Sequence, residues 1–376
     1  MLAGILKEQG PEKRVAMLPQ EAARLIQSGL DIKVEFSAGA EAYASDEEYT
    51  GVGACVASRA EIISEASLLL SVNPLPQADL KLCREGQILC SLLNPAECHE
   101  WLEEARVSGL TVLGLDLIPR ITRAQSMDVL SSMATVAGYR AVLDAASLLP
   151  RFFPMFMSAA GTIKPARVLI LGAGVAGLQA LAIARKLGAV VEVFDVRSAV
   201  REEVKSLGGK FIEVEGAMED DTAGGYAVEQ TEEFRIKQQE LIQKHALNSD
   251  VIIATAQIPG RKAPVLVLKE TVHKMKPGSV IIDLAASTGG NCELTQNGET
   301  VTVNSVKILG KSDYAAEMSY DASKMFGNNI LNLLKTMTSE EGTISPDFDD
   351  EIIHGTTAVH AKEYISCRVK QILNIT

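Results

Sequence analysis

The stretch from residue 167 to residue 197 constrains the fold of this chain more than any other. Val168–Leu171 is a short apolar run, which is typical of a strand buried on both faces. It leads into Gly-Ala-Gly-Val-Ala-Gly at 172–177, the glycine turn, and then into an alanine- and leucine-rich segment expected to be helical over 178–187. A second apolar run, 190–194, ends at an acid. This order of strand, glycine turn, helix and strand predicts a βαβ unit within a parallel sheet.

Each glycine of the turn has a physical role in binding a dinucleotide. Gly172 allows the tight turn, Gly174 lets the backbone approach a pyrophosphate, and Gly177 lets the helix pack closely on the strand. The N-terminus of the helix offers amide N–H groups and the positive end of its dipole to the phosphates. Asp195 lies 23 residues after Gly172, near the expected place of an acid that binds a ribose 2′-hydroxyl. The sequence therefore predicts a dinucleotide site.

Asp195 also predicts which dinucleotide is bound. A carboxylate accepts hydrogen bonds from a 2′-hydroxyl but repels a 2′-phosphate, so NAD(H) is expected in preference to NADP(H). Arg197 lies close by and is able to accommodate a 2′-phosphate, which keeps NADP(H) as the alternative.

The composition narrows the class of protein. A chain of 376 residues is long for one core, so two domains are expected. The net charge of −12 and the lack of a lysine- or arginine-rich run argue against nucleic acid as a partner. No apolar stretch reaches the roughly 20 residues of a spanning helix, and charges interrupt the first apolar residues. Neither a transmembrane segment nor a signal peptide is therefore expected.

The cysteines argue against a disulfide framework and against a zinc site. Six of them are scattered without a Cys-x-x-Cys pair, which predicts free, mostly buried thiols in a reducing compartment. They are Cys55, Cys83, Cys90, Cys98, Cys292 and Cys367. The histidines form no constellation either, so no metal site is expected.

Helix and strand signals alternate through the first 115 or so residues, which predicts a separate domain with its own parallel sheet. The expected strands are 2–6, 32–36, 67–72, 87–92 and 111–115. The expected helices are 19–28, 46–49, 61–66 and 97–107. A long helix expected over 133–149 then leads toward the glycine turn.

The same alternation resumes after Asp195. Expected helices are 199–207 and 232–244, and expected strands are 210–214, 251–254, 279–283 and 306–309. The acidic segment 215–231 has no clear period and is long for a connection, as functional or disordered loops are. A last pair of helices, near 321–334 and 361–373, is assigned back to the first domain.

The fold class expected from these elements is α/β, with two Rossmann-like doubly wound parallel-sheet domains joined by long helices. The first domain is discontinuous and comprises residues 1–131 and 320–376, and the second comprises residues 132–319.

Five blocks of the sequence carry a resemblance to a known family. They are RITRAQSMDVLS at 120–131 (the polar block), GAGVAG at 172–177, DVR at 195–197, TAGGY at 222–226 and VIIDLA at 280–285. Over essentially its whole length, the chain resembles the NAD(H)-binding component (alpha subunit, domain I) of proton-translocating NAD(P)+ transhydrogenase. This component belongs to the alanine dehydrogenase/transhydrogenase superfamily.

The resemblance implies an enzyme component that works only with partner subunits. It implies a homodimer, cytoplasmic and peripheral on the inner membrane, docked on membrane-embedded subunits that include an NADP(H)-binding domain. NADH bound by this chain would pass a hydride directly from its C4 to the C4 of NADP+, coupled to proton translocation.

By the same resemblance the polar block holds the nicotinamide, and Arg120, Gln125, Asp128 and Ser131 are the catalytic positions. A planar carboxamide needs donors and acceptors, which these side chains provide. Direct hydride transfer needs no general acid or base, only two rings held face to face and dry. An ordinary polar interdomain loop is the alternative interpretation.

The cofactor-binding positions combine the glycine turn, the acid and its neighbours, and a loop that resembles a mobile lid. They are Gly172, Gly174, Val175, Gly177, Asp195, Val196, Arg197, Gly225, Tyr226 and Gln257. Tyr226 matches the tip of the lid, the alternative being a surface tyrosine. Gln257 departs from the family, which has an apolar residue there near the adenine, so its adenine contact stays open. Asp283 fits either a turn-former or a cofactor contact.

Two other functions are compatible with some of these features. Alanine dehydrogenases share the opening Lys7-Glu8…Arg14-Val15-Ala16…Pro19, but they need a Lys and a His in the cleft. The matching stretches 71–74 and 91–94 carry neither, so deamination would lack a general base. A non-catalytic NAD-sensing protein is the third possibility, and the polar block around Gln125 argues against it, because a sensor need not present the nicotinamide outward.

Overall fold

The computed structural model describes residues 1–213, 232–258, 261–339 and 343–375. The chain divides into two compact units. The first unit comprises Met1–Met133 and Ala315–Thr376, and the second comprises Ala134–Tyr314. The boundaries expected from the sequence, after residue 131 and before residue 320, lie a few residues away from these.

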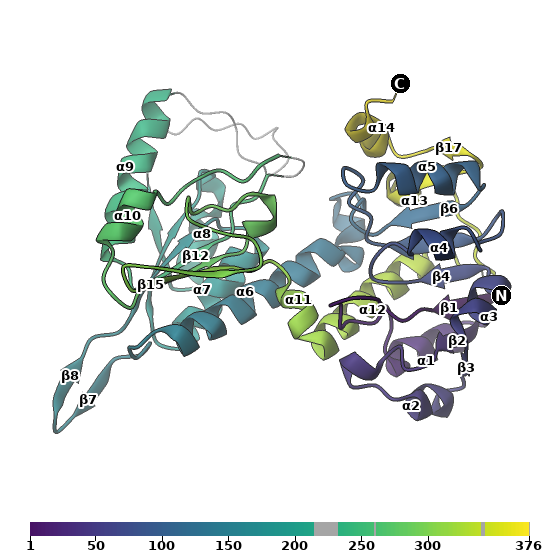
Figure 1. The fold of residues 1–376 in the computed structure, drawn as a ribbon, viewed down its shortest axis with the longest axis horizontal. Coiled ribbons are helices and arrows are strands. Elements are labelled where there is room, and N and C mark those ends of the chain that lie inside the picture. Colours follow the sequence, from purple (N-terminus) through teal and green to yellow (C-terminus); the bar gives the residue numbers. More distant parts are fainter. Residues whose placement is uncertain (214–231, 259–260, 340–342, 376) are drawn as a thin grey trace. The chain divides into compact units, whose positions relative to one another are not determined.

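The first unit is built on an eight-stranded sheet in the order β17-β16-β6-β5-β4-β1-β2-β3 (Figure 1). Strands β1 to β6 are parallel, and β16 and β17 add antiparallel at one edge. The strands are β1 Leu2–Ile5, β2 Asp31–Glu35, β3 Cys55–Ala57, β4 Leu68–Leu70, β5 Ile88–Ser91, β6 Thr111–Gly114, β16 Thr357–His360 and β17 Glu363–Tyr364.

Helices cover both faces of this sheet, which explains why its central strands are apolar throughout. In β4, Leu68 and Leu70 belong to a core shared with α1 and α12, whereas Leu69 points into a core shared with α3 and α5. The helices are α1 Pro19–Gln27, α2 Asp46–Gly51, α3 Arg59–Glu65, α4 Gln77–Leu80, α5 His99–Val107, α12 Ser319–Lys335, α13 Glu351–Thr356 and α14 Cys367–Leu373, with 3-10 turns η1 Ala40–Ala42 and η2 Thr122–Met127.

The second unit is built on a seven-stranded sheet in the order β11-β10-β9-β12-β13-β15-β14, of which only β14 is antiparallel. Val168 and Ile170 of β9 face a core with α6 and α7, and Leu169 and Leu171 face a core with α9 and α10. The strands are β9 Arg167–Leu171, β10 Val190–Phe194, β11 Lys210–Ile212, β12 Val251–Ala254, β13 Val280–Asp283, β14 Thr300–Val303 and β15 Val306–Gly310.

The helices of the second unit connect these parallel strands. They are α7 Val175–Lys186, α8 Arg201–Ser206, α9 Glu232–Asn248 and α10 Lys269–Lys274, with 3-10 turns η3 Ser198–Val200 and η4 Ala286–Thr288. Helix α6, Val129–Leu148, and helix α11, Tyr314–Glu317, each run across a boundary between the units.

Both sheets place their six parallel strands in the chain order 3-2-1-4-5-6, so the predicted doubly wound α/β fold class is confirmed. In such sheets, ligands bind at the carboxyl ends of the strands where the strand order reverses. This switch point lies between β1 and β4 in the first sheet and between β9 and β12 in the second.

The structure corrects three expectations from the sequence. The helix expected over 361–373 begins only at Cys367, because Glu363–Tyr364 pairs with β16 instead. Of the six free cysteines only Cys90 and Cys292 are buried, so the expectation of mostly buried thiols is wrong. The segment between Pro150 and Pro165, for which the sequence predicts no element, contains a hairpin.

This hairpin consists of β7 Phe156–Ser158 and β8 Gly161–Ile163, and it extends away from the second unit (Figure 1). Every residue in its two strands is exposed. The hairpin and the segment before it expose large apolar side chains, namely Phe152, Met155, Phe156, Met157 and Ile163.

Candidate functional site

The glycine turn connects β9 to α7 at the switch point of the second sheet. Gly172 has a φ of +106°, in the left-handed region that residues with a side chain rarely adopt. A Cβ on Gly177 would lie 1.8 Å from the carbonyl oxygen of Gly172, so this glycine allows the close contact of helix and strand. The fold itself therefore requires glycine at both positions.

Gly174 differs from these two glycines. Its φ of −78° is open to any residue, and a Cβ built on it meets nothing within 4 Å. Gly174 is the N-cap of α7, where no side chain caps the first N–H groups, and Val175 behind it is exposed. A bare backbone beside open space at a helix N-terminus fits a pyrophosphate, which the folded chain alone does not need.

Asp195 connects the end of β10 to the glycine turn. Its Oδ2 accepts a 2.7 Å hydrogen bond from the backbone N–H of Ala173, and its Oδ1 accepts one of 2.9 Å from that of Arg197. The guanidinium of Arg197 also donates to both oxygens, and this hydrogen bonding raises the pKa of Arg197 above its ordinary value. Val196 between them packs on the core beneath β9 and β12. The acid thus lies against the turn, as a ribose-binding acid should.

The loops after β12 and β13 complete this edge of the sheet. Asp283 is fully buried and accepts hydrogen bonds from the backbone N–H groups of Ala285, Asn291 and Cys292 and from the hydroxyl of Thr295. It is therefore a turn-former, which decides between the two roles that its sequence allows.

Gln257 is exposed, and its Nε2 donates a 3.0 Å hydrogen bond to the carbonyl of Leu284, which ties the two loops together. Asn291, which the sequence does not single out, is fully buried and bonds both backbone groups of Ala256 and the carbonyl of Pro264. Its only sequence signal is that it follows two glycines.

The polar block lies in the first unit and has ordered structure. Residues Thr122–Met127 form the 3-10 turn η2, in which Ala124 and Met127 are buried in the core while Gln125 is exposed. Asp128 accepts from the N–H and the hydroxyl of Ser131 at 2.9 and 2.6 Å, the pattern of a residue capping the start of α6. Burial alternates along the block because its apolar side chains anchor it and leave the polar ones outside.

Helix α12 holds the backbone of the polar block. The side-chain amides of Asn329 and Asn332 both donate to the carbonyl of Ser126, at 2.9 and 3.0 Å. Arg123 forms a two-pronged ion pair with Asp350, at 2.7 and 2.9 Å. Sequence reasoning missed these supporting residues, because they lie about two hundred positions away from the block.

The candidate residues therefore fall into two sets. The first unit carries Arg120, Gln125, Asp128 and Ser131, of which Asp128 and Ser131 are in direct contact and Arg120 and Gln125 are exposed. The second unit carries Gly172, Gly174, Val175, Gly177, Asp195, Val196, Arg197 and Gln257. Gly225 and Tyr226 lie outside the described residues.

The switch point of the first sheet is filled by its own side chains. The carboxylate of Glu8 accepts from the backbone N–H groups of Val72 and Asn73 and from the amide of Asn73, and burial raises the pKa of Glu8. Arg14 is 8% exposed and grips Glu12 with two hydrogen bonds of 2.8 and 2.6 Å. Burial alone would raise the pKa of Glu12, but Arg14 brings it below its ordinary value. The buried cation of Arg14 is thus already paired with a carboxylate.

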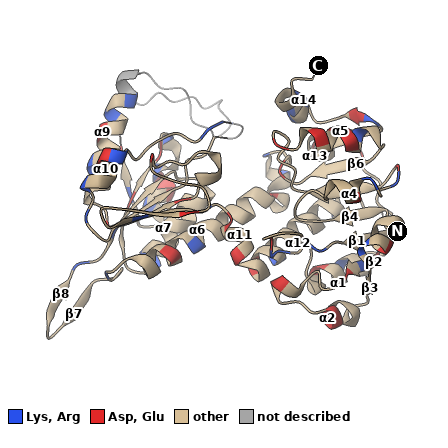
Figure 2. Cartoon of the chain, in the orientation of Figure 1, with Lys and Arg blue, Asp and Glu red and all other residues tan. Residues whose placement is uncertain are grey.

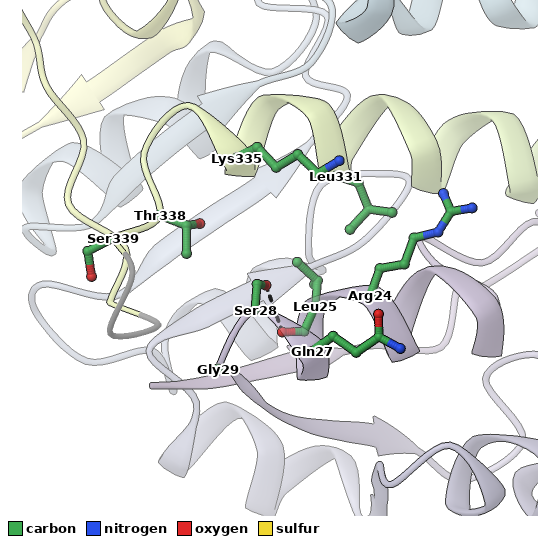
Figure 3. A pocket seen from close by; sticks show the side chains of 9 residues that line it. All are labelled: Arg24, Leu25, Gln27, Ser28, Gly29, Leu331, Lys335, Thr338 and Ser339. Carbon is green, nitrogen blue, oxygen red and sulfur yellow. Dashed lines mark hydrogen bonds between the residues drawn. The ribbon is translucent and has the colours of Figure 1, made fainter.

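A recess of about 360 Å³ lies elsewhere in the first unit, between the C-terminal ends of α1 and α12 (Figure 3). Its lining residues are Arg24, Leu25, Gln27, Ser28, Gly29, Leu331, Lys335, Thr338 and Ser339. Because Gly29 leads into the start of β2, the recess lies at the amino edge of the parallel sheet, opposite the switch point. It is therefore not part of the candidate site.

Charge and metal chemistry add little to the site. Figure 2 shows acidic and basic residues interspersed on the helices of both units. Within the described ranges, no three His, Cys, Asp or Glu side chains gather as a metal site would require. No helix in the described part of the chain is long and apolar enough to cross a membrane.

Comparisons with known proteins agree with this geometry. The family model "Alanine dehydrogenase/PNT, N-terminal domain" matches residues 4–137, and "Alanine dehydrogenase/PNT, C-terminal domain" matches residues 141–366. An NAD(P) transhydrogenase alpha subunit of Rhodospirillum rubrum is 45% identical over 366 residues, which cover 95% of each chain.

Two further proteins place the chain among its neighbours. The crystal structure of a transhydrogenase from Sinorhizobium meliloti superposes with a TM-score of 0.89 at 39% identity, covering 97% of this chain and all of that one. An alanine dehydrogenase of Mycolicibacterium smegmatis is 30% identical over 295 residues, which cover 77% of this chain and 74% of the dehydrogenase.

Proposed function

Because the chain belongs to the alanine dehydrogenase/PNT family, we propose that it is the NAD(H)-binding subunit of a proton-translocating NAD(P) transhydrogenase. The observation that carries the nucleotide site is Gly174, a glycine that the fold does not require, at the N-terminus of α7 beside Asp195. The similarity to transhydrogenase alpha subunits supports the rest of the proposal.

The proposed roles follow from the chemistry of each group. The N–H groups of the glycine turn would bind the pyrophosphate, and Asp195 the adenosine ribose. Bound NADH would supply a hydride from C4 of its nicotinamide to NADP+ on a partner subunit. Gln125, Asp128, Ser131 and Arg120 would orient the carboxamide of that nicotinamide. No residue has to move a proton, so orientation and the exclusion of water supply the rate.

The proposal includes a homodimer on the cytoplasmic side of a membrane, held there by membrane-embedded partners. The hairpin β7–β8 supports a second copy as one partner. A two-stranded sheet with both faces exposed is marginally stable in water, and its large apolar side chains favour burial in an interface. The lid proposed for Gly225 and Tyr226 rests on the sequence resemblance alone.

Alanine dehydrogenase remains the competing enzyme of the same family. A 2-oxo acid would need a free cation and a proton carrier, but Arg14 is already paired with Glu12, and the stretches 71–74 and 91–94 carry no Lys or His. These contacts favour the transhydrogenase function. An NAD-sensing protein would bind NADH as well, so turnover has to distinguish it.

The decisive experiment mixes the purified chain with the NADP(H)-binding subunit of a transhydrogenase and follows hydride transfer from NADH to an NADP+ analogue. We expect turnover only when both proteins are present. Oxidation of NADH by pyruvate and ammonia without the partner would establish the alanine dehydrogenase instead. Binding of NADH without turnover in either assay would favour the sensor.

A further inference from the structure

The carboxylate of Asp195 is saturated with hydrogen bonds. An ionised carboxylate has about four lone-pair positions on its two oxygens. Oδ1 accepts from the backbone N and from Nε of Arg197, both at 2.9 Å, and Oδ2 accepts from the backbone N of Ala173 at 2.7 Å and from Nη2 of Arg197 at 2.9 Å. The side chain of Asp195 is only 7% exposed as a result.

The four donors are of two kinds. The N–H groups of Ala173 and Arg197 belong to the backbone at the glycine turn and at the end of β10, so they fix the carboxylate in place. The other two donors belong to the guanidinium of Arg197, which is 29% exposed and sits on a rotatable side chain. Only the guanidinium is able to leave without moving the backbone.

We infer that the guanidinium of Arg197 competes with the hydroxyls of the adenosine ribose for the carboxylate of Asp195. A ribose diol donates two hydrogen bonds, and the two acceptor positions that the backbone does not use are those held by the guanidinium. Nucleotide therefore binds to molecules in which this side chain has swung away, and the apparent affinity is reduced by their fraction. This inference rests on the proposed NAD(H) site.

The displaced guanidinium also affects specificity. It lies two residues after the acid, and a cation beside the ribose offsets the repulsion between Asp195 and a 2′-phosphate. Arg197 is thus a specificity-determining residue that weakens binding of NAD(H) and moderates the rejection of NADP(H). Removal of its guanidinium is expected to change the two affinities in opposite directions.

The test compares Arg197→Met, which keeps the stem and removes the donors, with the wild-type chain in NADH and NADPH titrations. We expect the dissociation constant to fall at least threefold for NADH and to rise at least threefold for NADPH. Arg197→Lys keeps the charge without the fork, so its effect should be intermediate. Lys205→Met is the matched control, because it removes one charge from an exposed pair on α8 that does not touch Asp195, and it should change neither constant.

Two further arms test the route of the effect. AMP should bind Arg197→Met more tightly than wild type, whereas 2′,3′-dideoxy-AMP, which lacks both hydroxyls, should bind the two alike. In an Asp195→Asn background the substitution of Arg197 should bring no gain. Thermal melting of each variant confirms that the fold is intact.

The outcomes separate the inference from the function on which it rests. Equal or weaker NADH binding by Arg197→Met, with normal binding by wild type, would overturn the inference and leave the nucleotide site standing. An equal gain for the dideoxy nucleotide would overturn it too, since the effect would not pass through the diol. If neither protein bound NADH, the proposed site and the inference would both be wrong.

Discussion

The side-chain amide of Asn329 donates a 2.9 Å hydrogen bond to the carbonyl oxygen of Ser126, across 203 positions of sequence. Asn332, one turn further along α12, donates to the same oxygen. Two donors on one carbonyl fix the position of a backbone that would otherwise depend on two buried apolar side chains. The polar block is therefore held in place from a distant helix.

We expect Asn329→Ala/Asn332→Ala to reduce hydride transfer by about tenfold or more, because small displacements of a positioning group are costly to the rate. NADH affinity should change by less than about threefold, since the glycine turn is untouched. Asn328→Ala is the matched control, because Asn328 lies on the same helix but bonds Arg24 and Glu21. A parallel loss of turnover in Asn328→Ala would contradict the role assigned to the pair.

Gly174 and Gly177 should respond in opposite ways to the same substitution. Gly177→Ala places a methyl against the carbonyl of Gly172 and should lower the free energy of unfolding by about 1–3 kcal/mol. Gly174→Ala meets open space, so its stability should change by less than about 1 kcal/mol. Its NADH affinity should nevertheless fall at least tenfold, because the methyl lies where the pyrophosphate approaches. Denaturation curves and NADH titrations measure the two effects, and unchanged binding by Gly174→Ala would argue against a phosphate there.

Gln125→Asn should separate binding from transfer. The substitution keeps the amide but shortens its reach by one methylene, and a displacement near 1 Å costs a reaction about a hundredfold. NADH affinity should stay near that of wild type while transfer to an NADP+ analogue, measured with the partner subunit, falls sharply. Simultaneous loss of binding and turnover would make Gln125 a simple binding residue, and full turnover would remove it from the site.

Glu192 predicts a pH dependence of stability. Its carboxylate lies 2.8 Å from Nδ1 of His245 and 3.3 Å from Nζ of Lys210. Burial alone would raise the pKa of Glu192, but these contacts bring it below its ordinary value of 4.5. A lowered folded-state pKa stabilises the fold above pH 4.5, and the contribution is lost as the pH falls through the folded value.

Glu192→Gln should therefore lower the free energy of unfolding at pH 7, and its difference from wild type should shrink below about pH 4.5. Chemical denaturation across this range measures the difference. Glu202→Gln, which removes an exposed acid, is the control and should show little effect at any pH. A difference for Glu192→Gln that stays constant down to about pH 3 would show that the carboxylate charge is not what stabilises the fold.

Local signals explain which parts of the fold were predictable. The strand at Arg167–Leu171 and the turn after it were evident, because a buried parallel strand is apolar throughout and the turn needs glycine at fixed spacing. The hairpin β7–β8 was not, since its exposed apolar side chains follow no burial pattern within this chain. Strand β17 was missed because only pairing with β16 makes Glu363–Tyr364 a strand.

The site shows the same limit. The role of Asp283 could not be decided from its sequence, because a buried acid that accepts backbone N–H groups and one that binds a ligand both follow a strand. The saturation of Asp195 depends on the rotamer of Arg197, which no sequence pattern specifies. Contacts across long sequence separations, such as that of Asn329 with Ser126, carry no local signal at all.

The discontinuity of the first unit sets an order in which the chain becomes complete during synthesis. Strand β6 is an open edge until β16 and β17 pair with it, and the N–H of Val15 finds its partner, the hydroxyl of Ser323, only on α12. The second unit, by contrast, is contained within Ala134–Tyr314. On the ribosome, the unit encoded in the middle therefore has all its parts first, and the unit that begins the chain must wait with an unpaired edge for the last segment to emerge.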